Sequence, residues 1–231
     1  YIVVARYDEA RVATPVTIAA GEVTELPVVL DAGTVIVRPR PAPDAEIDSN
    51  AAVEFTLPDG RVTTFYGETS VVLPAGSQSV RAQIGEGELV TPFELAAGEV
   101  LEFDLVVGVG RAAVSATYVE GMVVEDGDLF IEIFAAKKDL QGNRKSMSYG
   151  YGAGTAFELP PGDYVAVAKM GEAIAETPFT VETGALVEPV VNLEAGVLAF
   201  EAPGTDFIEV FAAKKDIQGN RKGFGYGYGG A

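Results

Sequence analysis

The chain has 231 residues, 48% of them hydrophobic and 22% charged, and it contains no Cys, His or Trp. Its 16 basic and 34 acidic side chains give a net charge of −18. These counts exclude disulfides, metal sites built from Cys or His, and nucleophiles activated by His. The charge argues against nucleic acid as the main partner. The mean hydropathy of +0.22 excludes a disordered acidic chain.

The predicted elements, taken in chain order, are short β-strands. Residues 35–37, 53–57, 62–66 and 80–84 are rich in β-branched and aromatic side chains, and they often alternate with polar ones. Pro58-Asp59-Gly60 predicts a tight turn between two strands, and Asp31-Ala32-Gly33 predicts a strand-joining turn. About seven strands in roughly 80 residues are typical of a small β-sandwich. We therefore expect an all-β chain of tandem small antiparallel β-sandwich, Ig-like modules.

The chain also repeats itself. Thr14-Pro15 recurs at positions 91–92 and 177–178, at intervals of 77 (91 − 14) and 86 (177 − 91), and residues 134–145 recur at 211–222 with Leu140 replaced by Ile217. These repeats predict a C-terminal half of a repeat at 1–31, complete sandwich repeats at 32–108 and 109–194, and an N-terminal half at 195–231. Because both ends fall inside a unit, we expect an excerpt of a longer array. The alternative is that the halves complement each other, within one chain or between neighbours.

Several motifs resemble known modules. Leu159-Pro-Pro-Gly-Asp-Tyr-Val-Ala-Val-Ala168, together with residues 179–184 and 187–193, resembles a carboxypeptidase-regulatory-like or transthyretin-like β-sandwich. The hairpin 135–145 and the following Tyr-Gly-Tyr-Gly resemble tandem repeats behind von Willebrand factor A domains of secreted alphaproteobacterial proteins; the A domain itself is absent, because no Asp-x-Ser-x-Ser motif occurs. The resemblance implies an extracytoplasmic bacterial location (periplasmic, cell surface or secreted) and a non-catalytic spacer or adhesive role.

Lysine–asparagine isopeptide crosslinks occur in the related B-type modules of collagen adhesins. The first 136 residues of this chain contain no Lys, and the second complete unit has no first-strand Lys. We therefore expect no such crosslink.

Two hairpins hold half of all the basic residues. Each carries three positive charges in excess, so the rest of the chain carries −24 (−18 − 3 − 3). Tyrosines that alternate with Gly or Ser follow each hairpin, which places them on one strand face. The candidate interface residues are Lys137, Lys138, Arg144, Lys145, Tyr149, Tyr151, Lys214, Lys215, Arg221, Lys222, Tyr226 and Tyr228.

Two interpretations of these hairpins are open. In one, the tyrosines belong to the sandwich core and the lysines to a solvated loop. In the other, basic tips and aromatic faces dock on the acidic flank of a neighbouring repeat or of another chain of the same type. An acidic polysaccharide would suit the same residue types. The net charge argues against a nucleic-acid partner. We also expect no membrane span, because no apolar run reaches about 18 residues.

The acidic loops are weaker candidates. Asp44, Glu46, Asp48 and Asn50 alternate like the opening of a calcium loop, but Ser49 replaces the necessary Gly and Phe55 the closing Glu. Glu125, Asp126 and Asp128 occupy the equivalent loop of the next unit. A solvated loop is the favoured interpretation, and we predict no metal site and no cofactor.

No sequence motif of an enzyme is present. The chain has no Gly-x-Ser-x-Gly, Asp-Thr-Gly or Walker A motif, and among its 34 acids no pair stands out as the carboxylates of a glycosidase. We therefore predict a non-catalytic structural or adhesive module that spaces or self-associates through its basic hairpins. The alternative is a carbohydrate- or calcium-dependent ligand-binding module.

Overall fold

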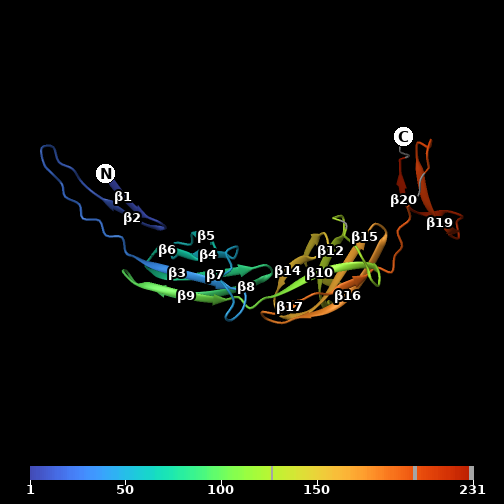
Figure 1. Cartoon of the computed structure of the whole chain (residues 1–231). Coiled ribbons are helices and arrows are strands. Elements are labelled where there is room, and N and C mark those ends of the chain that lie inside the picture. Colours follow the sequence, from blue (N-terminus) through green and yellow to red (C-terminus); the bar gives the residue numbers. More distant parts are fainter. Residues whose placement is uncertain (126, 200–201, 229–231) are drawn as a thin grey trace.

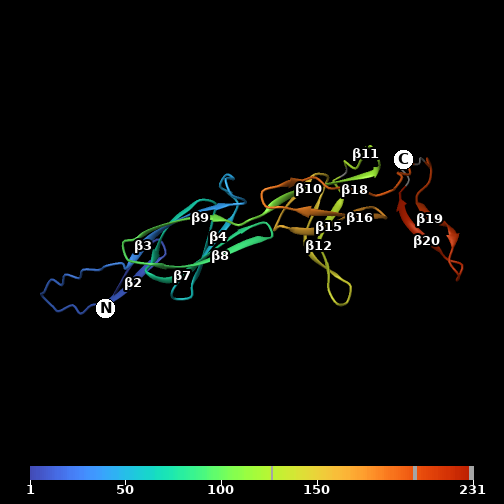
Figure 2. The ribbon, with the colours of Figure 1, turned by 90° about the horizontal axis from the view of Figure 1, so that it is seen from below.

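The computed structural model describes residues 1–125, 127–199 and 202–228, and in this part of the chain every regular element is a β-strand. Two β-sandwiches lie in line, with one two-stranded hairpin at each end of the molecule (Figures 1 and 2). The all-β fold class is thus confirmed. Within the described residues, no helix has the length and apolar character needed to cross a bilayer.

The first sandwich contains seven strands. They are β3 (Ala32–Arg40), β4 (Ala52–Thr56), β5 (Val62–Tyr66), β6 (Thr69–Pro74), β7 (Gly76–Ile84), β8 (Gly87–Leu95) and β9 (Val100–Val106). One sheet has the antiparallel order β5-β4-β7-β8, and the other has the order β6-β3-β9, in which β9 runs parallel to β3. Alternate residues such as Val35, Val37, Val53 and Phe55 are fully buried between the sheets. The period-two pattern of the sequence therefore places the apolar face inward, as predicted.

The second sandwich repeats this plan. Its strands are β10 (Gly110–Val119), β11 (Met122–Val123), β12 (Phe130–Lys138), β13 (Arg144–Tyr151), β14 (Thr155–Leu159), β15 (Gly162–Met170), β16 (Ala173–Val181), β17 (Leu186–Val187) and β18 (Val190–Asn192). The sheet β13-β12-β15-β16 faces a sheet in which β10 pairs with β11, β14, β17 and β18. Ile131 and Ile133 of β12 are fully buried in this core.

The two terminal hairpins stand apart from these cores. The N-terminal hairpin consists of β1 (Ile2–Tyr7) and β2 (Ala10–Pro15), and the C-terminal hairpin consists of β19 (Ile208–Lys215) and β20 (Arg221–Gly227). Each forms its own two-stranded sheet among the described residues. A two-stranded hairpin is marginally stable by itself in water, so both depend on neighbours.

One of the two turns predicted from the sequence forms in the structure, and the other does not. Pro58-Asp59-Gly60 forms the predicted turn between β4 and β5, and Gly60 has a φ of 82°. The turn predicted at Asp31-Ala32-Gly33 is wrong, because Ala32 and Gly33 already pair with β6 as the first residues of β3. Gly33 is needed for another reason: an added Cβ would lie 2.8 Å from the carbonyl oxygen of Ala96, so only glycine lets the two backbones approach.

Candidate interaction surface

The tip loops, residues 139–143 and 216–220, are held by one carboxylate each. Asp139 Oδ1 accepts hydrogen bonds from the backbone N–H groups of Gln141 (2.9 Å) and Asn143 (2.8 Å), and the Asp139 N–H donates to the carbonyl of Asn143 at 2.8 Å. Asp216 makes the same three bonds, at the same distances, in the second tip loop. The single acid of each tip therefore satisfies backbone donors. The two loop sequences, which differ only at Leu140 and Ile217, give the same hydrogen bonds because local contacts determine the conformation.

Both hairpin arginines are bound inside their own part of the chain. Arg144 Nη1 donates to Glu176 of β16 at 3.0 Å, and Nη2 lies 3.5 Å from the other carboxylate oxygen of Glu176. Arg221 donates to the carbonyl oxygens of Ala212 and Ala213. These two candidate contact residues thus brace the hairpins; Arg144 is half-buried, whereas Arg221 stays exposed like the lysines.

The lysines of both hairpins are exposed. This set comprises Lys137, Lys138, Lys145, Lys214, Lys215 and Lys222. Lys222 lies 3.5 Å from Glu172 in the β15–β16 turn, and its Nζ lies 5.0 Å from the ring centroid of Phe224. Ion pairs this exposed contribute little to stability, so the lysines are free to meet another molecule.

An apolar residue at each tip was not among the residues predicted from the sequence. Leu140 and Ile217 are fully exposed at equivalent positions of the two tip loops, and a Lys lies two residues before each and an Arg four residues after it. An aliphatic side chain that stands completely in water buries nothing in its own fold. The signal was the conservative replacement of Leu by Ile within an otherwise identical segment.

The tyrosines of β13 lie on the outer face, which contradicts the first of the two interpretations, in which they belong to the sandwich core. Tyr149 is 66% and Tyr151 65% exposed, and both rings pack against Phe130, with centroids 6.1 and 5.3 Å away. A β-bulge explains the change of face. Ile133 pairs with Ser148 and Phe134 with Ser146, so the intervening Met147 is an extra residue that packs against the core.

The C-terminal hairpin carries the same aromatic trio, here the group formed by one Phe and two Tyr. Phe207 lies 5.7 Å from Tyr226 and 5.5 Å from Tyr228, measured between ring centroids. The bulge is repeated too, because Val210 pairs with Gly225 and Phe211 with Gly223. Each hairpin therefore presents exposed tyrosine rings at one end and exposed lysines near its tip loop. Such residues are frequent at protein interfaces.

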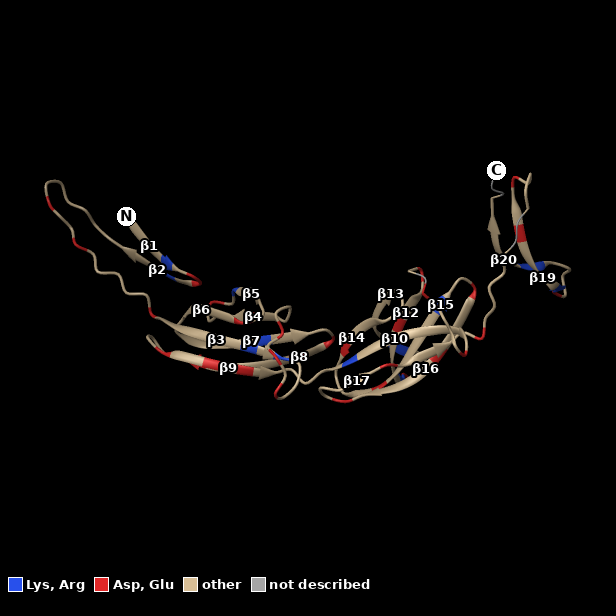
Figure 3. Ribbon diagram, in the orientation of Figure 1, with Lys and Arg blue, Asp and Glu red and all other residues tan. Residues whose placement is uncertain are grey.

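Acidic residues surround much of the first sandwich, which is the opposite charge to the tips (Figure 3). Residues 32–108 hold 4 basic and 12 acidic side chains, a net charge of −8 (4 − 12). Arg38 neutralises part of this charge, since it bridges Glu68 at 3.0 Å and Glu102 at 2.9 Å. The remaining excess makes the first sandwich an electrostatic counterpart of the tip loops.

The calcium-like loops do not gather into a metal site. Among the described residues, no group of three or more acids is placed to hold a metal ion. In the loop after β3, the carboxylate of Asp48 accepts a hydrogen bond from the N–H of Asn50 at 2.7 Å, as in an ordinary polar turn. Asp126, one of the three acids proposed for the equivalent loop, lies outside the described residues.

Neighbouring units meet in the same way at two successive boundaries. The N–H of Glu9, in the β1–β2 turn, donates to the carbonyl of Val72 in β6 at 3.2 Å. The N–H of Glu86, in the β7–β8 turn, donates to the carbonyl of Glu158 in β14 at 3.0 Å. Val72 and Glu158 occupy equivalent strands, 86 residues apart (158 − 72). We call each of these contacts a joint.

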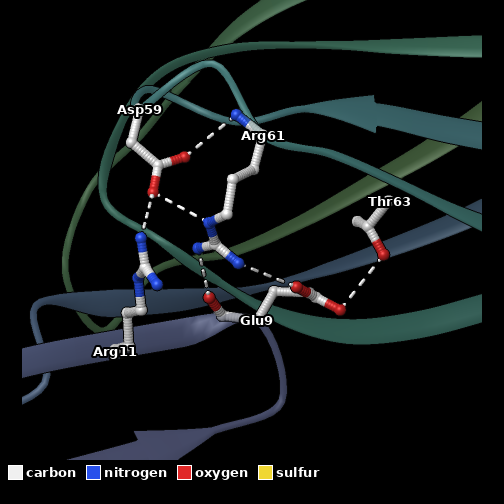
Figure 4. A network of polar contacts seen from close by, with 5 residues as sticks. All are labelled: Glu9, Arg11, Asp59, Arg61 and Thr63. Carbon is white, nitrogen blue, oxygen red and sulfur yellow. Dashed lines mark hydrogen bonds and ion pairs between the residues drawn. The ribbon is translucent and has the colours of Figure 1, made fainter. Parts of the chain in front are cut away.

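Side chains reinforce both joints. At the first, Arg61 donates to the carbonyl oxygen of Glu9 at 3.0 Å and lies 3.2 Å from its carboxylate, and it also pairs with Asp59 at 2.8 Å (Figure 4). These contacts of Arg61 hold the pKa of Asp59 below its ordinary value. At the second joint, Ala51 and Ile84 pack against Val109 in a small buried cluster between the two main cores.

Comparisons with known proteins are limited to distant structural likeness. No family model matches the chain and no curated protein matches it, so the relationship to repeats behind von Willebrand factor A domains stays a prediction. Among solved structures, the TIE protein of Bacillus anthracis is 19% identical, with a TM-score of 0.32, over 71% of this chain and 34% of that one. The chain thus spans about a third of that protein.

Two pilins are also similar. GBS52, the minor pilin of Streptococcus agalactiae, is 13% identical with a TM-score of 0.35, over 75% of this chain and 99% of that one. The shaft pilin SpaA of Lactobacillus rhamnosus GG is 10% identical with a TM-score of 0.37, over 73% of this chain and 99% of that one.

Proposed function

We propose that this chain is a non-catalytic, extracytoplasmic structural or adhesive arm of a bacterial protein, built from tandem β-sandwich units. The complete units are residues 32–108 and 109–194, and residues 1–31 and 195–231 belong to neighbouring units. One observation carries this proposal: the same joint forms at two successive boundaries, Glu9 to Val72 and Glu86 to Glu158. A repeated joint fixes the orientation of each unit relative to the next. Duplicated modules of this kind extend reach or valency.

The finer part of the proposal concerns self-association. Exposed lysines, the apolar tip residues Leu140 and Ile217, and the aromatic trios dock on the acidic face of another copy. The support is charge segregation: each hairpin carries +3, whereas residues 32–108 carry −8. Patches of opposite charge speed the encounter of two molecules and fix the register of their complex. The apolar tip residues supply a contact surface from which water is excluded.

Sedimentation velocity across a salt series tests this docking. We expect association at about 50 mM salt and its loss at about 500 mM, because the screening length shortens from roughly 14 to 4 Å. Lys138→Glu and Lys215→Glu should each weaken association several-fold. Arg6→Glu is the matched control, because it makes the same change of charge at an exposed residue of β1, outside both basic hairpins. If all three substitutions weakened association equally, the tip lysines would act only as general surface charge, and the docking proposal would be contradicted.

A second candidate is the binding of an acidic polysaccharide, which the presence of exposed tyrosines and exposed lysines on the same two hairpins favours. Tyrosine rings offer flat apolar faces, and lysines offer partners for carboxylate or sulfate groups. Titration with polygalacturonate, with dextran as the neutral control, tests it. Saturable binding of polygalacturonate that Lys138→Glu weakens would support this candidate, and equal behaviour of the two polymers would refute it.

A further inference from the structure

An arginine closes the first joint. Arg61 donates from Nη1 to the carboxylate of Glu9 at 3.2 Å and from Nη2 to the backbone carbonyl of the same residue at 3.0 Å (Figure 4). Thr63 of β5 donates its hydroxyl to the other carboxylate oxygen of Glu9 at 3.1 Å. One turn residue therefore holds a guanidinium group through two different acceptors, and a hydroxyl from the neighbouring strand lies beside them.

The second joint keeps the acidic residue of this arrangement. Glu86 is the counterpart of Glu9, since the two positions are one repeat apart (86 − 9 = 77) and each is the second residue of a two-residue hairpin turn. The N–H of Glu9 donates to Val72 and that of Glu86 to Glu158, which are equivalent strand positions of the next unit. In the described part of the chain, the carboxylate of Glu86 has no hydrogen-bond or ion-pair partner.

The second joint also keeps the hydroxyl. Ser148 of β13 pairs with Ile133 of β12, and Thr63 of β5 pairs with Phe55 of β4. Ile133 and Phe55 lie at equivalent places in the two central strand pairs, opposite residues of β15 and β7 that are 86 positions apart. Ser148 is therefore the counterpart of Thr63 in position as well as in chemistry.

An open hollow replaces the arginine at the second joint. It has a volume of about 470 Å³, and we call it the joint hollow; its lining includes Asn50, Glu86, Arg111, Ser148, Tyr149 and Glu158. Of the described residues that line it, only Arg111 is basic. The basic residues of the second hairpin line a separate hollow near their own tip loop, because β12 and β13 have 9 and 8 residues where β4 and β5 have 5 each.

Negative charge is in excess around the joint hollow. Glu86 and Glu158 are opposed by Arg111, which forms no ion pair with either among the described residues. Burial raises the pKa of the Glu158 carboxyl, the charge of Asp48 raises it further, and Arg111 lowers it. A further cation in the hollow would relieve this unfavourable concentration of negative charge.

The chemistry of the lining favours a guanidinium group over an ammonium group. Tyr149 is 66% exposed and offers an aromatic ring at the rim of the hollow, and guanidinium groups stack on such rings. The planar fork of a guanidinium also reaches two acceptors at once, as Arg61 does with the carboxylate and the carbonyl of Glu9. An ammonium group is a compact point charge without that fork.

We propose that the joint hollow binds the guanidinium group of an arginine side chain presented by a partner protein. The carboxylate and carbonyl oxygens of Glu86 accept its N–H groups, Ser148 lies beside the carboxylate, and Tyr149 covers one face of the guanidinium plane. This site adds a partner of defined chemistry to the proposed arm. It does not depend on docking of the tip loops, because Arg144 and Arg221 of the tips are bound within their own chain.

Titration of the whole chain with N-acetyl-argininamide tests the site, with the backbone amide NMR signals of Glu86 and Ser148 as the readout. We expect saturable shifts with half-saturation at about 1–10 mM, as for a single side chain in an open site. N-acetyl-citrullinamide has a neutral urea of the same shape and should bind about 10-fold more weakly, because it makes no charged hydrogen bond. N-acetyl-lysinamide should bind several-fold more weakly than the arginine amide.

Substitutions in the lining locate the binding. Glu86→Gln removes the charge and keeps the backbone of the turn, and it should weaken binding of the arginine amide about 10-fold. Glu120→Gln is the matched control, because Glu120 is an exposed acid in the β10–β11 turn, at the opposite end of β10 from Arg111. Arg111→Gln removes the competing cation and should strengthen binding about 2- to 5-fold.

Equal binding of the arginine and citrulline amides would overturn the proposal, as would a Glu86→Gln variant that binds like Glu120→Gln. Equal binding of the arginine and lysine amides would also overturn it, because the hollow would then attract cations in general. The amides are monovalent probes, so these results are separate from the sedimentation experiment. Failure of tip docking in that experiment would leave the arginine site intact, and the reverse also holds.

Discussion

Gly85, in the β7–β8 turn of the first sandwich, lies against Glu158 of β14 in the second, so closely that a Cβ added to Gly85 would fall 2.6 Å from the Cβ of Glu158. The next residue, Glu86, donates its N–H to the carbonyl of Glu158 at 3.0 Å. The second joint therefore depends on a glycine for two reasons, its close approach and its φ of 52°.

Gly85→Ala should loosen the joint. The matched control is Gly171→Ala in the equivalent turn of the second sandwich, where φ is 59° and an added Cβ meets nothing within 4 Å. Both variants carry the backbone strain of about 1–2 kcal/mol, but only Gly85→Ala displaces the neighbouring unit. We expect small-angle scattering to show a broader distribution of shapes for Gly85→Ala alone. An unchanged scattering profile for that variant would contradict a rigid joint.

Arg61→Gln should release the N-terminal hairpin from the first sandwich. Arg61 connects Glu9 and Asp59, so its loss leaves the hairpin without its main side-chain contact (Figure 4). Amide hydrogen exchange of β1 and β2 should accelerate about 5- to 30-fold, which corresponds to about 1–2 kcal/mol for a partly buried network. Arg38→Gln, which removes the bridge between Glu68 and Glu102, should leave exchange in the hairpin unchanged.

Glu158→Gln should stabilise the second joint near neutral pH. Burial raises the pKa of the Glu158 carboxyl above its ordinary value of 4.5, the charge of Asp48 raises it further, and Arg111 lowers it. A raised folded-state pKa means that the folded protein holds the proton more tightly than the unfolded chain. The stabilising contribution is therefore complete below pH 4.5 and is lost as the pH rises through the raised value.

The measurement is the melting temperature of each variant between pH 4 and pH 7. We expect Glu158→Gln to exceed the unaltered chain by about 1–3 °C at pH 7, with the difference vanishing toward pH 4. Glu188→Gln, at an exposed position in the same sandwich, should show no such convergence. A difference that stays constant with pH would attribute the gain to something other than this carboxyl.

Ile133→Ala should lower the free energy of unfolding much more than Tyr151→Ser does. Ile133 is fully buried on β12, so its truncation leaves a cavity and should cost about 2–5 kcal/mol. Tyr151 lies outside and loses only its contact with Phe130, about 0.5–1.5 kcal/mol. Denaturant unfolding of the two variants measures the difference. A loss of unfolding free energy for Tyr151→Ser as large as that for Ile133→Ala would indicate that Tyr151 is buried in the core.

The sequence by itself determined the local and repetitive features of this protein. Strand positions, the turn at residues 58–60 and the identity of the two basic hairpins follow from period-two patterning, turn chemistry and duplicated segments, all of which act over a few residues. The outward face of Tyr149 and Tyr151 did not follow, because the bulge at Met147 shifts the alternation by one residue.

The tertiary structure decided which residues that are far apart in the sequence come into contact. Arg144 pairs with Glu176, 32 residues away, and Glu86 meets Glu158, 72 residues away (158 − 86). Neither contact has a local signal, because each depends on which strands become neighbours once the sheets pack. The repeated segments predicted that the chain is divided into units. Only their packing showed how the turn of one unit contacts a strand of the next.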